Sequence, residues 1–213
     1  MYKILITILI VSSSTFGKGD IAVKITDDMS YIHTKDGGKR VTVQRIQDTN
    51  NRLTDDYAKT SRPCPPFCIQ PTKVADGIDN IGEIELLKFM QDDVVNGKGV
   101  VVDARLKSWY ELETIPSAIN LPYTVIENGS KRKVEKVFRL LGMRINSDGS
   151  WDFSHLKILA IFDNGLWCEQ ATHLIDAMLR YGLPKDKILY YRGGFQGWKL
   201  LGLTTVVHKE IKR

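Results

Sequence analysis

The chain has 213 residues, of which 43% are hydrophobic and 26% charged, and its formal net charge is +5. These proportions are typical of a folded globular protein with one medium domain and an appendage, or with two small domains, and they exclude a disordered chain. No long block of lysine and arginine interleaved with aromatic residues occurs, so the sequence indicates no nucleic-acid partner.

The first 17 residues have the order of features found in a secretory signal peptide. Lys3 precedes a short, mostly apolar run from Ile4 to Val11, and small polar residues then lead to Gly17, where we place the cleavage. The run is too short to span a bilayer as a helix. A buried first strand is the alternative, but a serine cluster is a poor end for such a strand. We therefore expect a periplasmic or secreted protein with no stable membrane insertion after removal of residues 1–17.

Residues 18–75 are expected to form a β-rich extension. The segments IAVKI, SYIHT and VTVQRI alternate between apolar and polar residues, and KDGGKR before the last of them is a turn signal. The pattern predicts a small hairpin or meander that is docked on the main domain, because such a unit is too small to be stable alone. The polar stretch from Asp48 to Tyr57 is expected to be a loop.

A connector rich in cysteine and proline, SRPCPPFCIQP, ends the extension. Its prolines exclude a helix or a central strand. In an oxidising compartment we expect a disulfide between Cys64 and Cys68, with free or redox-active thiols as the alternative, and Cys168 as the cysteine left over. The histidines are scattered along the chain, so we expect no metal site.

From residue 76 onward, short apolar runs alternate with amphipathic segments. The strands expected are 99–105, 117–123, 157–163 and 187–191, and the helices expected are 80–93, 131–142, 168–182 and 195–202. This alternation predicts an α/β domain with a central, mostly parallel sheet. Ligands of such sheets bind beyond the carboxyl ends of the strands, where Asp103–Arg105 and Asp163–Cys168 are expected to lie.

Three local patterns follow one another in this part of the chain: VVVDARLKSWYELETIPSAINLP, then IFDNGLWCEQ, then ILYYRGGFQGWKLLGL. Together they resemble the rhodanese-like domain, over roughly residues 76–208. The arrangement is most similar to an exported subgroup whose active loop reads Cys-Asn-Gly-Pro-Trp-Cys, and CPPFC looks like part of that subgroup. The resemblance implies a three-layer rhodanese-like domain at residues 76–213, in a family whose members carry sulfane sulfur on a loop cysteine.

The sequence departs from this family at the catalytic position, because Asp163 stands where the resemblance places the nucleophilic cysteine. The loop keeps Asn164, Gly165, Trp167 and Cys168. A carboxylate cannot hold transferable sulfur, so we expect Asp163 to cap the loop. Cys168, near the first turn of a helix whose dipole can lower a thiol pKa, is the candidate carrier; the alternative is a small buried residue that packs the loop.

The remaining site residues follow from the same loop and from the resemblance. The backbone amides of residues 164–169 are the candidate anion cradle, so the candidate substrate-binding residues are Asn164, Gly165, Leu166, Trp167 and Glu169. The resemblance implies structural roles for five other residues: an internal polar pair, a tight strand exit and a ring that fills the core, namely Asp103, Arg105, Gly193, Gly194 and Trp198.

The sequence thus predicts an exported rhodanese-like protein that handles sulfane sulfur or thiols with weak or altered sulfurtransferase activity and without a cofactor. Its expected partner is a small sulfur-containing anion or a thiol protein. The missing catalytic cysteine leaves open whether the chain is an enzyme. One alternative is a catalytically inactive binding or regulatory module. The other is a thiol-redox protein that uses Cys64, Cys68 and Cys168.

Overall fold

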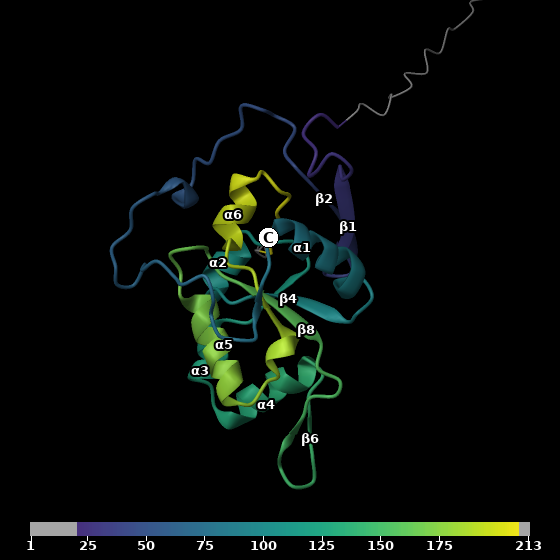
Figure 1. Ribbon diagram of the computed structural model, residues 1–213, viewed down its shortest axis with the longest axis vertical. Helices are drawn as coiled ribbons and strands as arrows, with labels where there is room; N and C mark the ends of the chain where they lie inside the picture. The colour runs from purple at the N-terminus through teal and green to yellow at the C-terminus, as the bar shows by residue number, and fades with distance from the viewer. Residues whose placement is uncertain (1–20, 209–213) are drawn as a thin grey trace, which may run out of the picture.

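The computed structural model describes residues 21–208, so the expected signal peptide lies outside the described residues. The core of the domain is a five-stranded sheet in which every neighbouring pair is parallel (Figure 1). The strand order across this sheet is β3 (Asp79–Asn80), β9 (Ile188–Tyr190), β8 (Ile158–Phe162), β4 (Gly99–Asp103) and β5 (Ala118–Asn120). Within residues 21–208, no helix combines the length and the apolarity needed to cross a bilayer.

Apolar side chains leave both faces of the two central strands. Val102 and Ile161 pack into the hydrophobic cluster on one face, and Val101 and Ala160 pack into the cluster on the other. All four residues are fully buried. Successive side chains of a strand point to opposite faces, so a continuous apolar run predicts a strand covered on both sides. The expectation of a buried parallel sheet is therefore confirmed.

Helices cover both faces of the sheet and complete three layers (Figure 1). One face carries α3 (Tyr123–Glu127), α4 (Lys131–Leu140) and α5 (Gln170–Arg180). The other face carries α1 (Glu83–Phe89) with the π-helical turn η2 (Met90–Val94), α2 (Lys107–Leu112) and α6 (Gly194–Leu200). Besides β3, whose Asn80 lies in the expected helix 80–93, the sequence did not reveal the short helices α2 and α3 or the 3-10 turn η3 (Lys185–Lys187). These helical elements have six, five and three residues, and segments of that length are too short to show a helical period.

A β-hairpin near the start of the described chain docks on the second face. It pairs β1 (Tyr31–Asp36) with β2 (Lys39–Gln44) through Gly37 and Gly38, which both have positive φ as this type of tight turn requires. Ile32 and Val43 of the hairpin are buried in the same cluster as α6. The prediction of a docked hairpin is confirmed, but the predicted strand over IAVKI is wrong. Residues 21–30 form no strand, because two tight backbone bonds fold Ile25 and Thr26 back onto Met29.

The rest of the extension crosses the molecule with little regular structure. It leaves β2, passes α6 and turns back toward the start of α5, with one short 3-10 turn, η1 (Asp56–Ala58), on the way (Figure 1). We call residues 57–71 the strap. A second, unpredicted hairpin of β6 (Arg144–Ile145) and β7 (Trp151–Asp152) lies at the opposite end of the domain (Figure 1).

Gly194, the first residue of α6, allows the start of α6 to lie directly against the loop after β8. Gly194 has φ +60°, and a Cβ added there would lie 2.5 Å from the backbone nitrogen of Gly165 and 2.6 Å from its Cα. The expected tight strand exit at Gly193 and Gly194 is therefore the place where α6 meets the loop after β8.

This close approach predicts a large loss of stability in Gly194→Ala. Gly149 also has positive φ, +84°, but an added Cβ would meet nothing within 4 Å. Gly149→Ala should thus cost only the left-handed backbone strain, about 1 to 2 kcal/mol. Gly194→Ala should cost at least about 2 kcal/mol more, since the backbone of Gly165 must move. Urea denaturation of both variants measures the difference, and equal losses would contradict the prediction.

Candidate active site

The loop between β8 and α5 is closed by the side chain that begins it. Asp163 is fully buried. Its Oδ1 accepts a hydrogen bond from the backbone N–H of Gly165 at 3.0 Å, and its Oδ2 accepts one from Ala171 at 2.8 Å. The carboxyl group therefore ties the loop to the first turn of α5, which is the capping arrangement expected for it.

Burial sets the charge state of this carboxyl group. Burial away from water raises the pKa of Asp163 to about 7. The backbone N–H groups of Ala171 and Gly165 oppose this rise because they stabilise the ionised form. The carboxyl group therefore holds its proton to a much higher pH than an exposed aspartic acid does. A titrating carboxyl at the carboxyl end of a central strand is a feature of functional sites as well as of structural networks.

Cys168 belongs to the same loop, and its side chain is buried. Its side chain is only 5% exposed, and α5 begins two residues later, at Gln170. Burial and, to a smaller extent, the negative charge of Asp163 raise the pKa of the Cys168 thiol to about 12. The expected lowering of this pKa by the helix dipole is wrong, because loss of solvent and the nearby carboxylate outweigh the amide groups. The thiol is protonated at neutral pH and is a poor nucleophile in this arrangement.

A chain of buried polar groups connects Cys168 with the end of β4. The Asn164 side-chain amide donates to the Cys168 sulfur at 3.5 Å, and its carbonyl oxygen accepts from the Tyr57 hydroxyl at 2.7 Å. That hydroxyl accepts from Arg105 at 2.8 Å. The Arg105 side chain in turn donates three hydrogen bonds, of 2.9, 3.1 and 2.6 Å, to the two carboxylate oxygens of Asp103. The two residues form the internal polar pair that the resemblance implied.

Tyr57 is the member of this network that the sequence did not reveal. It ends a polar stretch and is the middle residue of η1, yet it is only 7% exposed. Its ring packs edge-on against Phe195 with the centroids 5.2 Å apart, and its carbonyl oxygen accepts from the Gln196 side chain at 2.7 Å. A single tyrosine in a loop carries no periodic signal, so only the packing of the extension on α6 identifies it.

The strap also covers the outer part of the loop. The Arg62 guanidinium lies 3.8 Å above the ring of Trp167, and Phe67 meets the same ring edge-on at 5.5 Å. The backbone N–H of Gln70 donates to the carbonyl oxygen of Leu166 at 2.8 Å. The loop residues that were expected to face a ligand therefore contact the chain's own extension.

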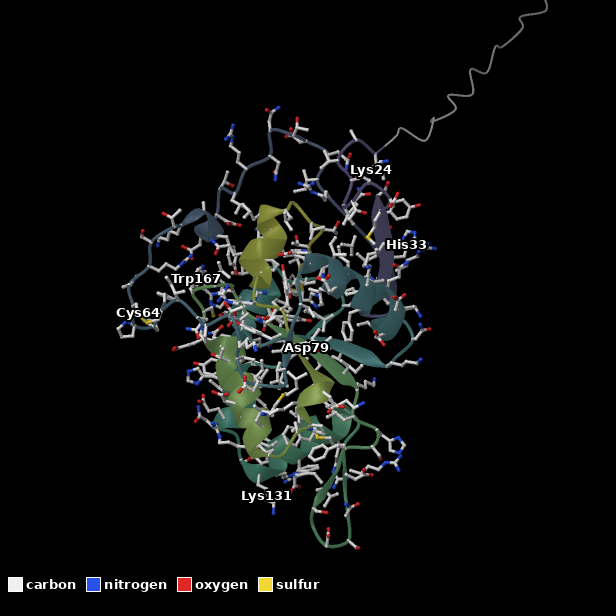
Figure 2. All side chains as sticks on the ribbon, viewed as in Figure 1. Lys24, His33, Cys64, Asp79, Lys131 and Trp167 are labelled. Atoms are coloured by element: carbon white, nitrogen blue, oxygen red, sulfur yellow. A yellow bond between two sulfur atoms is a disulfide. The ribbon has the colours of Figure 1, made fainter. Side chains whose placement is uncertain are left out.

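Cys64 and Cys68 are joined by a disulfide in the strap, between Arg62 and Gln70. Figure 2 shows Cys64 and Trp167 on the same side of the molecule. The disulfide closes the turn that carries Phe67 to the Trp167 ring.

Two N–H groups of the predicted amide cradle donate to acceptors of the chain itself. The Gly165 N–H is used by Asp163, and the Cys168 N–H donates to the Gly165 carbonyl at 2.9 Å. Glu169 lies 3.9 Å from His173, outside the loop's interior. Asp163 therefore supplies to Gly165 the kind of negative oxygen that a substrate would bring, while the expectation of an anion site at the amides of 164–169 as a whole stays a prediction.

The structural residues of α6 hold the loop from the other side. The N–H groups of Phe195 and Gln196 donate to the carbonyl oxygens of Asp163 and Asn164 at 2.8 and 3.0 Å. Trp198 is fully buried, as expected of a ring that fills the core. Among residues 21–208, no three histidine, cysteine or acidic side chains are grouped in a way that could hold a metal ion.

The model of the rhodanese-like domain matches residues 85–201. The chain belongs to the rhodanese-like domain family. This rhodanese-like chain resembles solved structures at low identity. Against a thiosulfate sulfurtransferase from Pseudomonas aeruginosa the identity is 16% and the TM-score 0.41, over 62% of this chain and 21% of that one. Against a human single-domain sulfurtransferase the identity is 20% and the TM-score 0.37, over 56% and 94% of the two chains.

A protein from Bacillus halodurans is similar at 19% identity and a TM-score of 0.42, over 61% of this chain and 77% of its own length. A comparison with curated proteins gave no match. Family membership therefore rests on the match over residues 85–201.

The buried carboxyl of Asp163 predicts a pH-dependent stability. Its pKa in the folded chain, about 7, lies above the ordinary value of 3.8. The stability that it contributes is therefore complete below about pH 4 and is lost as the pH rises through 7. Relative to Asp163→Asn, the free energy of unfolding of the natural chain should fall over this range, by up to about 4 kcal/mol. Urea denaturation at several pH values measures this difference.

Asp148 provides a matched control of opposite sign. Its carboxyl is exposed, and hydrogen bonds from Ser150 lower its pKa. Relative to Asp148→Asn, the natural chain should therefore gain a little stability as the pH rises toward about 4, and the difference should then stay constant up to about pH 7. A flat profile for the Asp163 pair would mean that the buried carboxyl does not titrate near neutrality.

Proposed function

We propose that the chain is an exported rhodanese-like protein that handles sulfane sulfur or thiols with weak or altered sulfurtransferase activity. The observation that carries the proposal is the position of Asp163. Its carboxyl group ends β8 and accepts the N–H groups of Gly165 and Ala171, at the place where the family resemblance expects a sulfur-bearing thiolate.

The chemistry of sulfur transfer explains why the activity is low. A thiolate attacks the outer sulfur of a donor such as thiosulfate, sulfite leaves with the bonding electron pair, and the enzyme keeps a persulfide. The Asp163 carboxylate cannot form that persulfide, and its ionised form repels an anionic donor. Cys168 is buried and its pKa is raised, so it attacks only if the loop and the strap move away from it.

Export and the partner class complete the proposal. The signal-like pattern of residues 1–17 supports export, and the disulfide between Cys64 and Cys68 suits an oxidising compartment such as the periplasm. A small sulfur-containing anion or a thiol protein is the proposed partner, because both are substrates that a sulfane-sulfur carrier exchanges with.

An inactive binding or regulatory module is the second candidate, and the strap favours it. Tyr57 is hydrogen-bonded to Asn164, while Arg62 and Phe67 cover Trp167. These contacts leave the loop interior closed to a donor. A thiol-redox function is supported only by the Cys64–Cys68 disulfide, since the third cysteine is buried and its thiol protonated at neutral pH.

The central experiment restores the thiolate. In a thiosulfate-to-cyanide assay the natural protein should turn over slowly, and Asp163→Cys should raise the rate at least about tenfold, equivalent to about 1.4 kcal/mol of barrier. The N–H groups of Gly165 and Ala171 belong to the backbone, so they remain to stabilise the new thiolate. Asp163→Ser, which has a similar size but no thiol, is the matched control. A folded but inactive Asp163→Cys would favour the binding module.

Cys168→Ser tests whether the second loop position carries sulfur. If the residual activity of the natural protein disappears in this variant, and mass spectrometry finds a persulfide on Cys168, that residue is the carrier. We expect no persulfide in the natural protein purified after incubation with thiosulfate, because the thiol is buried. A stoichiometric persulfide on Cys168 would contradict this expectation.

A further inference from the structure

An open groove lies beside the loop, between the extension and α6. Its volume is about 720 Å³. One wall comes from the extension, the floor includes Leu166 and Trp167 of the loop, and the other wall is the exposed side of α6 with Gln196, Lys199 and Leu200. Figure 1 shows the extension passing beside α6. Neither the buried carboxyl of Asp163 nor the thiol of Cys168 lines this groove.

Large apolar side chains are exposed around the groove. Ile69 is 85% exposed, Leu200 is 71% exposed and Leu166 is 47% exposed. The three come from the strap, α6 and the loop, and they line one groove together with Leu53. Apolar side chains gathered in a concave surface are typical of a binding site, whereas single exposed ones are ordinary.

The charged groups of the lining are all cationic. They are Arg52, Lys59 and Lys199, and none of the acidic side chains in residues 21–208 lines the groove. Lys199 is neutralised by Asp55 and Glu113, and Lys59 lies 3.6 Å from Asp56. Arg52 has no ion-pair partner within the described part of the chain. Arg52 is thus the lining cation whose charge is not offset there, and the groove suits a ligand that is apolar over most of its surface and negative at the end that faces Arg52.

We propose that this groove binds a small organic anion with an apolar body. A volume of about 720 Å³ lies within the range of roughly 300 to 1,000 Å³ found for small-molecule sites. The carboxylate or sulfonate lies toward Arg52 and Lys59, and the body packs on Leu166, Trp167 and Leu200. Exposed ion pairs contribute little, so the apolar contacts supply most of the affinity and the cations select the charge.

This binding site does not depend on the sulfur chemistry proposed for the loop. The ligand contacts Leu166 and Trp167 where they line the groove. Of the polar network of the loop, Tyr57 also lines the groove, whereas Asn164, Arg105 and Asp103 do not. Ligand binding and sulfurtransferase activity can accordingly fail independently.

The first test uses anilinonaphthalene sulfonate, an apolar aromatic anion, as the probe. Fluorescence titration and calorimetry on the natural protein should show one probe molecule bound per chain. Leu200→Glu should weaken binding at least about tenfold, because it places a charge on the apolar wall. Leu140→Glu is a matched control: Leu140 ends α4 as Leu200 ends α6, and it is 74% exposed but far from the groove lining. Equal affinities of the two variants would overturn the proposal.

The second test concerns the charge. Phenylnaphthylamine has nearly the same apolar body without the sulfonate, and it should bind at least about tenfold more weakly than the anion. The double variant Arg52→Glu with Lys59→Glu should bring the two probes to similar affinity by weakening only the anion. If both probes bind the natural protein equally well, the groove is only an apolar surface and selection for anions is wrong.

Discussion

A carboxylate and a guanidinium buried at the end of β4 hold the parts of this site together. Asp103 and Arg105 are both completely buried. A buried guanidinium is tolerated only when its N–H groups are paired, and those of Arg105 bind Asp103, the Tyr57 hydroxyl and the carbonyl oxygen of Glu113. The pair thus joins the sheet, the extension and the segment after α2. Removing either partner would leave an uncompensated charge in the core.

The loop takes its form from this network and from Asp163. Through Tyr57, the ion pair fixes Asn164, and Asn164 in turn contacts Cys168. On the other side, the carboxyl group of Asp163 uses the N–H groups that could otherwise bind an anion. The rhodanese-like fold is therefore kept while the centre of its loop is filled by the chain's own groups. The groove beside α6 is an open space next to this closed loop.

The extension decides which surfaces of the domain remain available. The strap lies on Trp167 and Leu166, and the same segment builds one wall of the groove. A rhodanese-like domain without residues 57–71 would expose the Trp167 ring and lack that wall. The extension is thus part of the site and not only a connection to the hairpin.

The sequence by itself determined the alternation of strands and helices, because short apolar runs such as 99–103 and 158–162 are typical of strands buried on both faces. The proposal that Asp163 stands in the place of a catalytic cysteine also comes from the sequence, through the resemblance of the loop Asp163–Cys168 to the family's motif. Only the tertiary structure decided the state of Cys168 and the role of Tyr57. The pKa of a thiol depends on how much water and which charges surround it. Here those surroundings come from Asp163, Asn164 and a tyrosine 111 positions earlier in the chain, whose packing no local pattern encodes.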